Sequence, residues 1–302
     1  MYPVYRYTGK QTLCDTVMTT FIPQQQNRQP GYEYMMIPPP ITENAYYQAS
    51  QKLKNQVAII TGGDSGIGRA IALAYAKEGC QIVFTYLTET EDAITTEKMI
   101  RDLGSSPLVI PIDLTVKKNA EYVIEQTLKE FGQINILVNN QGIQFNTPDI
   151  ENITEEQLLL VFQTNLFSYI YMIQAALPHL NEGACIINTA GAIAYQGSPV
   201  FIDASAASGG IVSLTRSLAP SLAKKKIRIN GVAPGAIWTP LIPSSYSAKE
   251  VTTFGTNTEK TLLNRAGQPF EAASCYVFLA SDDASFMTGQ FLHPNGGLIM
   301  MS

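Results

Sequence analysis

The stretch of sequence that decides the fold is VAIITGGDSGIGRAIALAYA, residues 57–76. A short apolar, β-branched run, VAIIT, leads into the glycine-rich turn GGDSGIG at residues 62–68, and a helical pattern follows it. Glycines let a backbone turn tightly and approach a pyrophosphate, and the helix behind them points free N–H groups at the anion. The stretch therefore predicts a dinucleotide phosphate site, with an ordinary tight turn between strand and helix as the alternative.

The same alternation of strand and helix continues along the chain from Lys52. β-Branched runs predict strands at 57–61, 81–85, 108–112, 134–138, 184–188, 227–232 and near 290–293. Helices are expected between them, at about 66–79, 91–103, 116–131, 154–181, 205–225 and 269–281. This order is typical of βαβ units around a parallel sheet. We therefore expect an α/β, Rossmann-type doubly wound sheet in a single domain, residues 51–302, with a substrate loop at about 241–264.

Residues 1–50 have a different composition from the rest of the chain. They are rich in Gln, Tyr and Pro and show no sustained period of 2 or 3.6. This favours an extended N-terminal arm over a second domain. Its aromatic residues are expected to dock either on the body of the protein or on a neighbouring subunit.

Composition argues against several classes of partner. The formal charge of −5 provides no broad basic field, which disfavours nucleic acid and anionic membranes. Four widely spaced cysteines and two histidines indicate neither a disulfide framework nor a metal site. No apolar run approaches the roughly 18 residues of a membrane span, and no signal peptide is evident. The sequence thus predicts a soluble, cytoplasmic protein whose partner is a small molecule.

Five motifs, which follow one another in order and include the glycine-rich turn, carry a resemblance to a known family. They are TGGDSGIG (61–68), Asp113 in DLT, Asn139-Asn140-Gln141-Gly142, PGAIWT (234–239) and TGQFLHPNGG (288–297). Residues 52–302 resemble the short-chain dehydrogenase/reductase family, particularly its bacterial and fungal members with long N-terminal arms. There these motifs are the TGxxxGxG loop, the adenine-contacting DLT, NNAG, the PGxxxT that holds the nicotinamide carboxamide, and a C-terminal signature.

The resemblance implies that NAD or NADP is the cofactor. The residues implied to bind it are Gly62, Ser65, Gly66, Ile67, Gly68, Asp113, Asn139, Ile237 and Thr239. Asp113 and Asn139 are also suited to capping strand ends, a role compatible with cofactor contact. The end of the second strand, Thr85-Tyr86-Leu87-Thr88, holds neither the acid that binds ribose hydroxyls nor the base that binds a 2′-phosphate, so the preference between NAD and NADP stays open.

The family's reaction centre is where this sequence departs from the pattern. The family places a serine 13 residues before a tyrosine and a lysine four residues after it. Alignment through INTAG (187–191) and SGGIVSLTRSLA (208–219) puts Gly191, Ala204 and Ser208 at these three positions. No shift of one residue or one helical turn recovers a Tyr-x-x-x-Lys pair. The family's fourth residue, an asparagine in the kink of the long helix, is present as Asn165, which could equally satisfy backbone groups at a helix bulge.

The absence of the family's serine, tyrosine and lysine from this sequence leaves three functions open. The first is a repurposed enzyme acting on a bulky apolar molecule, by hydride transfer to an activated acceptor such as an iminium, or by cyclisation or isomerisation. The second is a noncatalytic nucleotide-binding or assembly subunit. The third is a carbonyl reductase that recruits Tyr195 or Tyr246 as its proton donor. By resemblance, a homodimer or homotetramer is expected through the helices at 154–181 and 205–225.

Overall fold

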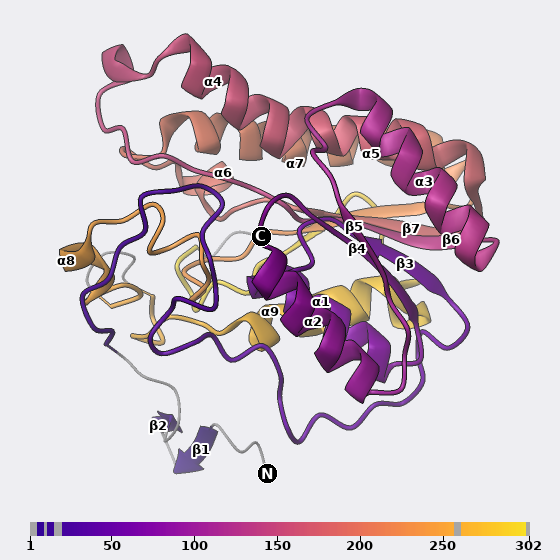
Figure 1. The fold of residues 1–302 in the computed structure, drawn as a ribbon, viewed down its shortest axis with the longest axis horizontal. Helices are drawn as coiled ribbons and strands as arrows, with labels where there is room; N and C mark the ends of the chain where they lie inside the picture. Colours follow the sequence, from indigo (N-terminus) through magenta and orange to yellow (C-terminus); the bar gives the residue numbers. More distant parts are fainter. Residues whose placement is uncertain (1–4, 9–10, 15–19, 257–260, 300–302) are drawn as a thin grey trace.

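The computed structural model describes residues 5–8, 11–14, 20–256 and 261–299. Seven parallel strands form one sheet in the order β5-β4-β3-β6-β7-β8-β9 (Figure 1). The strands are β3 (Val57–Ile60), β4 (Gln81–Tyr86), β5 (Leu108–Pro111), β6 (Ile134–Asn139), β7 (Leu180–Thr189), β8 (Arg228–Val232) and β9 (Phe291–Leu292). The chain moves outward from β3 in one direction and then from β6 in the other, which confirms the predicted doubly wound α/β fold.

Helices cover both faces of this sheet (Figure 1). One face carries α1 (Gly66–Lys77), α2 (Thr90–Asp102) and α9 (Pro269–Ala280), whose apolar residues share a core cluster with the strands. The other face carries α3 (Lys117–Phe131), α5 (Ser168–Ala176) and α7 (Ile202–Ala223), which share a second cluster. The central strands are apolar on both sides because both of their faces are buried.

The helix expected at 154–181 is divided into four parts. It consists of α4 (Glu155–Phe162), a π-helical turn (Gln163–Phe167), α5 and a 3₁₀ turn (Leu177–His179). Within the described residues, Glu155–His179 is also the one helical run long and apolar enough to cross a membrane by length and composition. This run was not predicted from the sequence, where no apolar run of this length was found. A core helix of a soluble protein meets the same criteria, and α5 buries Met172 and Ile173 in the cluster beneath the sheet, with Tyr169 buried against Ile211 and Val212.

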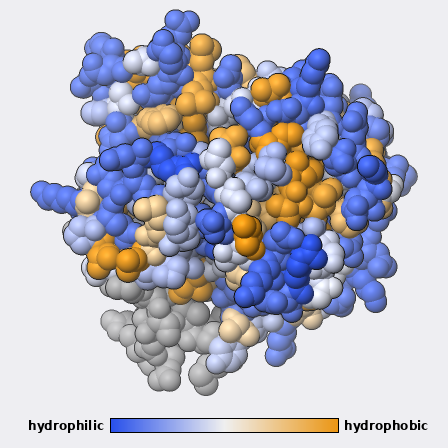
Figure 2. Space-filling model, in the orientation of Figure 1, coloured by the Kyte–Doolittle hydropathy of each residue, from blue (hydrophilic) through white to orange (hydrophobic). Residues whose placement is uncertain are grey.

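Apolar side chains reach the surface over α4. Leu158, Leu159 and Leu160 are each between 43% and 48% exposed. Figure 2 shows hydrophobic residues near the upper left edge, where Figure 1 places this helix. The predicted association through the two long helices stays a prediction.

Short elements complete the chain. They are a hairpin of β1 (Tyr5–Thr8) and β2 (Gln11–Cys14), two 3₁₀ turns (Ile150–Asn152 and Asp282–Ala284), α6 (Ile193–Gln196) and α8 (Ala248–Val251). The expected substrate loop contains α8, and its residues 257–260 lie outside the described part of the chain.

The N-terminal arm packs on the body of the same chain from residue 20 onward. The ring of Phe21 stacks on Trp238, with 3.8 Å between ring centroids and 14° between the planes. The indole Nε1 of Trp238 donates a hydrogen bond to the carbonyl of Pro38 at 3.0 Å, and Met36 is buried in the same cluster. The structure thus shows the arm docked on the body of its own chain. Docking on a neighbouring subunit stays a prediction.

Candidate active site

A single cavity of about 400 Å³ contains most of the residues singled out from the sequence. It lies at the carboxyl ends of the strands, around the point between β3 and β6 where the strand order reverses. The segments that follow β3, β4, β5, β6, β7 and β8 all contribute to its lining. This crevice is where open α/β sheets bind their ligands.

The glycine-rich turn is built for close backbone approach. Gly66 has a φ of +52°, and a Cβ added to it would lie 3.1 Å from the side chain of Thr239. A Cβ on Gly68 would lie 1.9 Å from the carbonyl oxygen of Gly62, inside the space of that atom. Larger residues at either position would strain the turn or displace the opposite wall.

The N-terminus of α1 offers donors for an anion. The backbone N–H of Arg69 donates a hydrogen bond to the carbonyl of Ser65, and the N–H of Gly66 donates to the carboxylate of Glu33 at 2.6 Å. The N–H groups of Ile67 and Gly68 have no acceptor among the described residues. Free N–H groups at the positive end of a helix beside a glycine turn fit the pyrophosphate of a dinucleotide.

Charged groups surround the end of β4, where the sequence indicated none. Asp64 and Glu89 both line the cavity there. Burial, reinforced by the nearby Glu89 carboxylate, raises the pKa of Asp64 to about 7. Arg28 reaches the same corner from the arm and donates to Thr88 Oγ1 and Glu89 Oε1, both at 2.8 Å. No signal at the strand end could have revealed Arg28, because it lies 60 residues earlier than Thr88.

Seven of the nine expected cofactor residues meet in the cavity lining. They are Gly62, Ser65, Gly66, Ile67, Asp113, Ile237 and Thr239. Gly68 lies behind the turn, and Asn139 is fully buried, with its amide donating to Asn188 at 2.9 Å. It is the next residue, Asn140, that lines the cavity and donates to the carbonyl of Gly62 at 3.1 Å.

The three positions that the alignment assigns to the serine, tyrosine and lysine of the family pattern also meet in this cavity. Gly191, Ala204 and Ser208 all line it. A Cβ added to Gly191 would lie 3.6 Å from the hydroxyl of Ser208, so these two positions face one another. What they present to the cavity is a methyl group, a hydroxyl and backbone, none of which is a proton donor titrating near neutrality.

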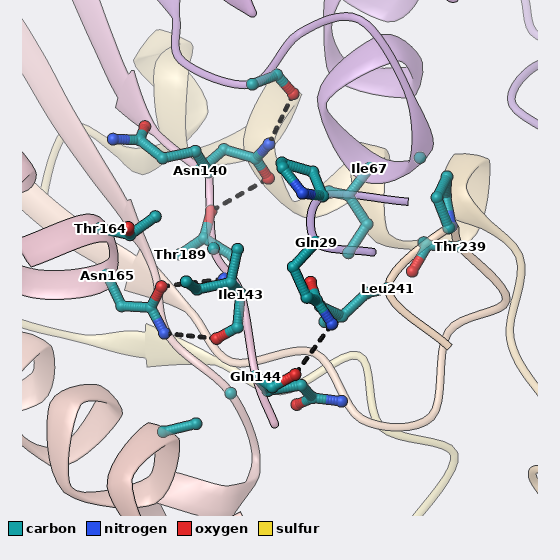
Figure 3. Close-up of a pocket in the computed structure, with 18 of the residues that line it drawn as sticks. Gln29, Ile67, Asn140, Ile143, Gln144, Thr164, Asn165, Thr189, Thr239 and Leu241 are labelled. Atoms are coloured by element: carbon teal, nitrogen blue, oxygen red, sulfur yellow. Dashed lines mark hydrogen bonds between the residues drawn. The ribbon is translucent and has the colours of Figure 1, made fainter. Parts of the chain in front are cut away.

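Asn165 is placed in the π-helical turn and lines the cavity. Its Oδ1 accepts from the N–H of Ile143 at 2.9 Å, and its Nδ2 donates to the carbonyl of Ile143 at 2.8 Å. Figure 3 shows these two bonds, which tie the long helix to the segment after β6. The amide thus serves the backbone, which is the alternative role considered from the sequence.

The two tyrosines considered as donors have different positions. Tyr195 does not line the cavity. Its ring lies 4.6 Å from that of His293, and its buried hydroxyl has no hydrogen-bond partner among the described residues. Burial also raises its pKa. Tyr246 does line the cavity, so the recruited-tyrosine hypothesis narrows to this residue.

The sheet order, the glycine turn and the crevice define a dinucleotide-binding α/β protein. A family model described as "Enoyl-(Acyl carrier protein) reductase" matches residues 62–299. The chain belongs to the short-chain dehydrogenase/reductase family of NAD(P)-dependent oxidoreductases.

Curated relatives match along nearly the whole chain. The uncharacterized oxidoreductase YhdF of Bacillus subtilis (strain 168) is 51% identical over 275 residues, covering 91% of this chain and 94% of the relative. The glucose and ribitol dehydrogenase of Daucus carota is 46% identical over 286 residues, covering 93% and 97%. The NADPH-dependent aldehyde reductase 1 of Arabidopsis thaliana is 45% identical over 284 residues, covering 92% and 98%.

Solved structures share the fold. A short-chain dehydrogenase/reductase of the glucose/ribitol dehydrogenase type from Brucella melitensis is 34% identical, with a TM-score of 0.75 over 83% of this chain and 99% of that one. A short-chain dehydrogenase from Burkholderia cenocepacia, solved in complex with NADP, is 25% identical, with a TM-score of 0.76 over 82% and 99%.

Proposed function

We propose that this protein binds NAD(H) or NADP(H) and exchanges hydride with an acceptor that is already activated, such as an iminium carbon on a bulky apolar molecule. The observation that carries this proposal is the continuity of one cavity. It runs from the phosphate turn at Gly66 and Ile67 to the three small residues at 191, 204 and 208. A ligand can therefore reach from the anion-binding end to the reaction centre without interruption.

The phosphate end supplies binding and orientation. The N–H group of Ile67, which lines the cavity, would hold the pyrophosphate, and Thr239 stands across the turn from Gly66. When bound, the nicotinamide supplies or accepts the hydride. NADP is bound by the Burkholderia relative, and the Arabidopsis relative is named as NADPH-dependent, which supports a nicotinamide cofactor for this chain.

The reaction centre decides which acceptors are suitable. Reduction of a ketone at neutral pH needs a proton donor of suitable pKa beside the carbonyl oxygen. Ala204 provides no donor, and Ser208 provides no cation that could lower the pKa of one. In an iminium, the carbon takes the hydride, the C=N π electrons move to nitrogen, and a neutral amine forms without a proton from the protein.

The lining also favours a bulky apolar acceptor. Around Gly191 and Ala204 the cavity is bounded by apolar side chains, which include Ile193, Phe201, Ile242 and Phe254. Three small residues occupy the positions that carry larger side chains in the family pattern. The same space could hold a substrate in a reactive conformation, so that proximity promotes cyclisation or isomerisation.

The test combines binding and turnover in the full-length protein. Calorimetry with the four dinucleotides should show binding of at least one, and NAD(P)H oxidation should be measurable with a cyclic iminium and negligible with matched ketones. Binding without oxidation by any iminium would favour a noncatalytic nucleotide-binding or assembly subunit, which the loss of the three side chains also allows. Ketone reduction that disappears in Tyr246→Phe would instead establish a recruited donor.

A further inference from the structure

The N-terminal arm crosses the cavity described above. We define the strap as residues 26–36 of this arm. Gln29, Pro30 and Gly31 line the cavity directly, beside residues of the phosphate turn and of the segment after β8. Figure 3 shows the side chain of Gln29 lying between Ile67 and Gln144. A segment far outside the family's dinucleotide motifs therefore forms one wall of the site.

The amide of Gln29 joins two loops of the body. Its Nε2 donates to the carbonyls of Gln144 at 2.8 Å and Ser244 at 3.1 Å, and it lies 3.1 Å from Ser245 Oγ. These contacts fix the orientation of the amide. Its Oε1, however, is buried and has no hydrogen-bond partner among the described residues. A buried carbonyl oxygen without a donor is unfavourable, and a hydrogen-bond donor on a ligand in the cavity that Gln29 lines would satisfy it.

The strap is seated firmly on the substrate side. A Cβ added to Gly31 would lie 2.5 Å from the carbonyl oxygen of Pro240, so only glycine fits at this approach. The N–H of Gln26 donates to the carbonyl of Pro243 at 2.6 Å. Both contacts fall just after Thr239, where the PGAIWT segment (234–239) that the resemblance assigns to the nicotinamide carboxamide ends.

The other end of the strap is fixed to the phosphate side. The buried carboxylate of Glu33 accepts from the N–H of Gly66 and forms an ion pair with Arg69. The N–H groups of Glu33 and Tyr34 donate to the carboxylate of Asp92 at 2.7 and 2.9 Å. Glu33 does not line the cavity, so it supports the turn from behind and leaves Ile67 and Gly68 free for an anion.

We propose that the strap is part of the ligand site and that Gln29 Oε1 accepts a hydrogen bond from a hydroxyl or amide N–H on the nicotinamide half of the dinucleotide. This proposal rests on the proposed function, because it needs a bound dinucleotide. It assigns to the arm a role in recognition in addition to packing. Gln29 is the contacting residue, and Glu33 is a positioning residue that acts through Gly66.

Calorimetric titration of full-length variants tests the contact. NADH and NADPH serve as complete ligands, and ADP serves as a probe with the pyrophosphate and no nicotinamide. Gln29→Ala should weaken dinucleotide binding about tenfold, as expected for a well-oriented hydrogen bond, and should leave ADP binding unchanged within about twofold. The matched control is Gln24→Ala, because the side chain of Gln24 forms hydrogen bonds with Ile22 and Ile37 within the arm.

Each outcome bears on a different statement. If the wild-type protein binds no dinucleotide, the proposed function fails, and this inference fails with it. If the wild type binds and Gln29→Ala binds equally well, or loses NADH and ADP affinity alike, the assigned contact is wrong while the proposed function stands.

A second measurement needs no variant and so covers the case of a poorly folded one. Hydrogen exchange of amides 26–36 in the wild-type protein should slow when NADH saturates the site, because the ligand would hold the strap closed. Unchanged exchange in this segment at saturation would overturn the strap's place in the site.

Discussion

The two ends of the cavity differ in whether backbone groups or individual side chains determine their chemistry. The phosphate end depends on backbone N–H groups and on glycines such as Gly66 and Gly68, which the fold itself positions. The reaction end depends on the chemistry of individual side chains, and there the chain has Gly191, Ala204 and Ser208. The fold therefore positions the phosphate end through the backbone, whereas the proposed loss of the three side chains at 191, 204 and 208 would change the reaction end alone.

The largest effect is expected from restoring the side chains at the reaction end. The triple variant Gly191→Ser, Ala204→Tyr, Ser208→Lys should reduce simple ketones on the order of 10⁴-fold faster than the wild type, the lower end of what general acid catalysis and electrophilic assistance supply together. A steady-state assay of NAD(P)H oxidation measures this. Ala204→Tyr alone is the control and should gain little, since without the lysine its pKa stays near 10. Substantial ketone reduction by the wild type would contradict this account.

An effect of intermediate size is expected from the carboxyl at the phosphate end. Burial raises the pKa of the Asp64 carboxyl from its ordinary 3.8 to about 7 in the folded chain. The folded state therefore holds the extra proton between these values, and stability falls as pH rises from about 4 through 7, by about 4 kcal/mol for this group. Urea unfolding of the ligand-free protein at pH 5 and pH 8 should show this decline in the wild type.

The matched variant for that experiment is Asp64→Asn, which keeps the shape of the side chain and removes its titration. Its unfolding free energy should fall less between pH 5 and pH 8 than that of the wild type. Burial also raises the pKa of Glu33 and Asp92, so a residual pH dependence is expected in both proteins. Identical pH profiles would show that Asp64 ionises normally.

The smallest of the three effects concerns the turn itself. Gly66→Val should weaken dinucleotide binding about 100-fold, because the added Cβ meets Thr239 and the φ of +52° is unfavourable for a β-branched residue. Gly104→Val is the control, since Gly104 has a φ of +84° and open space around it. Both variants should lose stability, and only Gly66→Val should lose affinity in a calorimetric titration. If Gly66→Val and Gly104→Val bound the dinucleotide with equal affinity, the glycine-rich turn would not be part of the binding site.

Hydrophobic periodicity predicted the sheet well. The observed ends of β3, β4, β5, β6 and β8 lie within one residue of those expected. β7 begins four residues earlier than expected, at Leu180. Residues 181–183 (Asn-Glu-Gly) are exposed and lack the β-branched pattern from which the strand was predicted. The long helix was predicted without its four-part division, since a π-helical turn changes the backbone hydrogen bonds and leaves the apolar pattern intact.

The strap could not have been predicted from the sequence. Residues 1–50 have no period to show which side chains face the body, and the partners of Gln29 lie 115 and 215 residues away. The same limit applies to Arg28 at the end of β4. Local patterns determine helices and strands, whereas these contacts arise only once the sheet has brought distant loops to one edge.

The distance along the chain between Gln29 and Ser244 also sets the order in which the molecule can form. Gln29 is synthesised 215 residues before Ser244 and 216 residues before Ser245. Until then, Phe21 and Met36 have no Trp238 cluster to pack against. Bringing together residues so far apart is slower than local helix formation, so we expect the strap to reach its second anchor after helices such as α1 have formed. A ribosome-bound chain that ends before residue 240 thus carries the phosphate turn without the strap's second anchor.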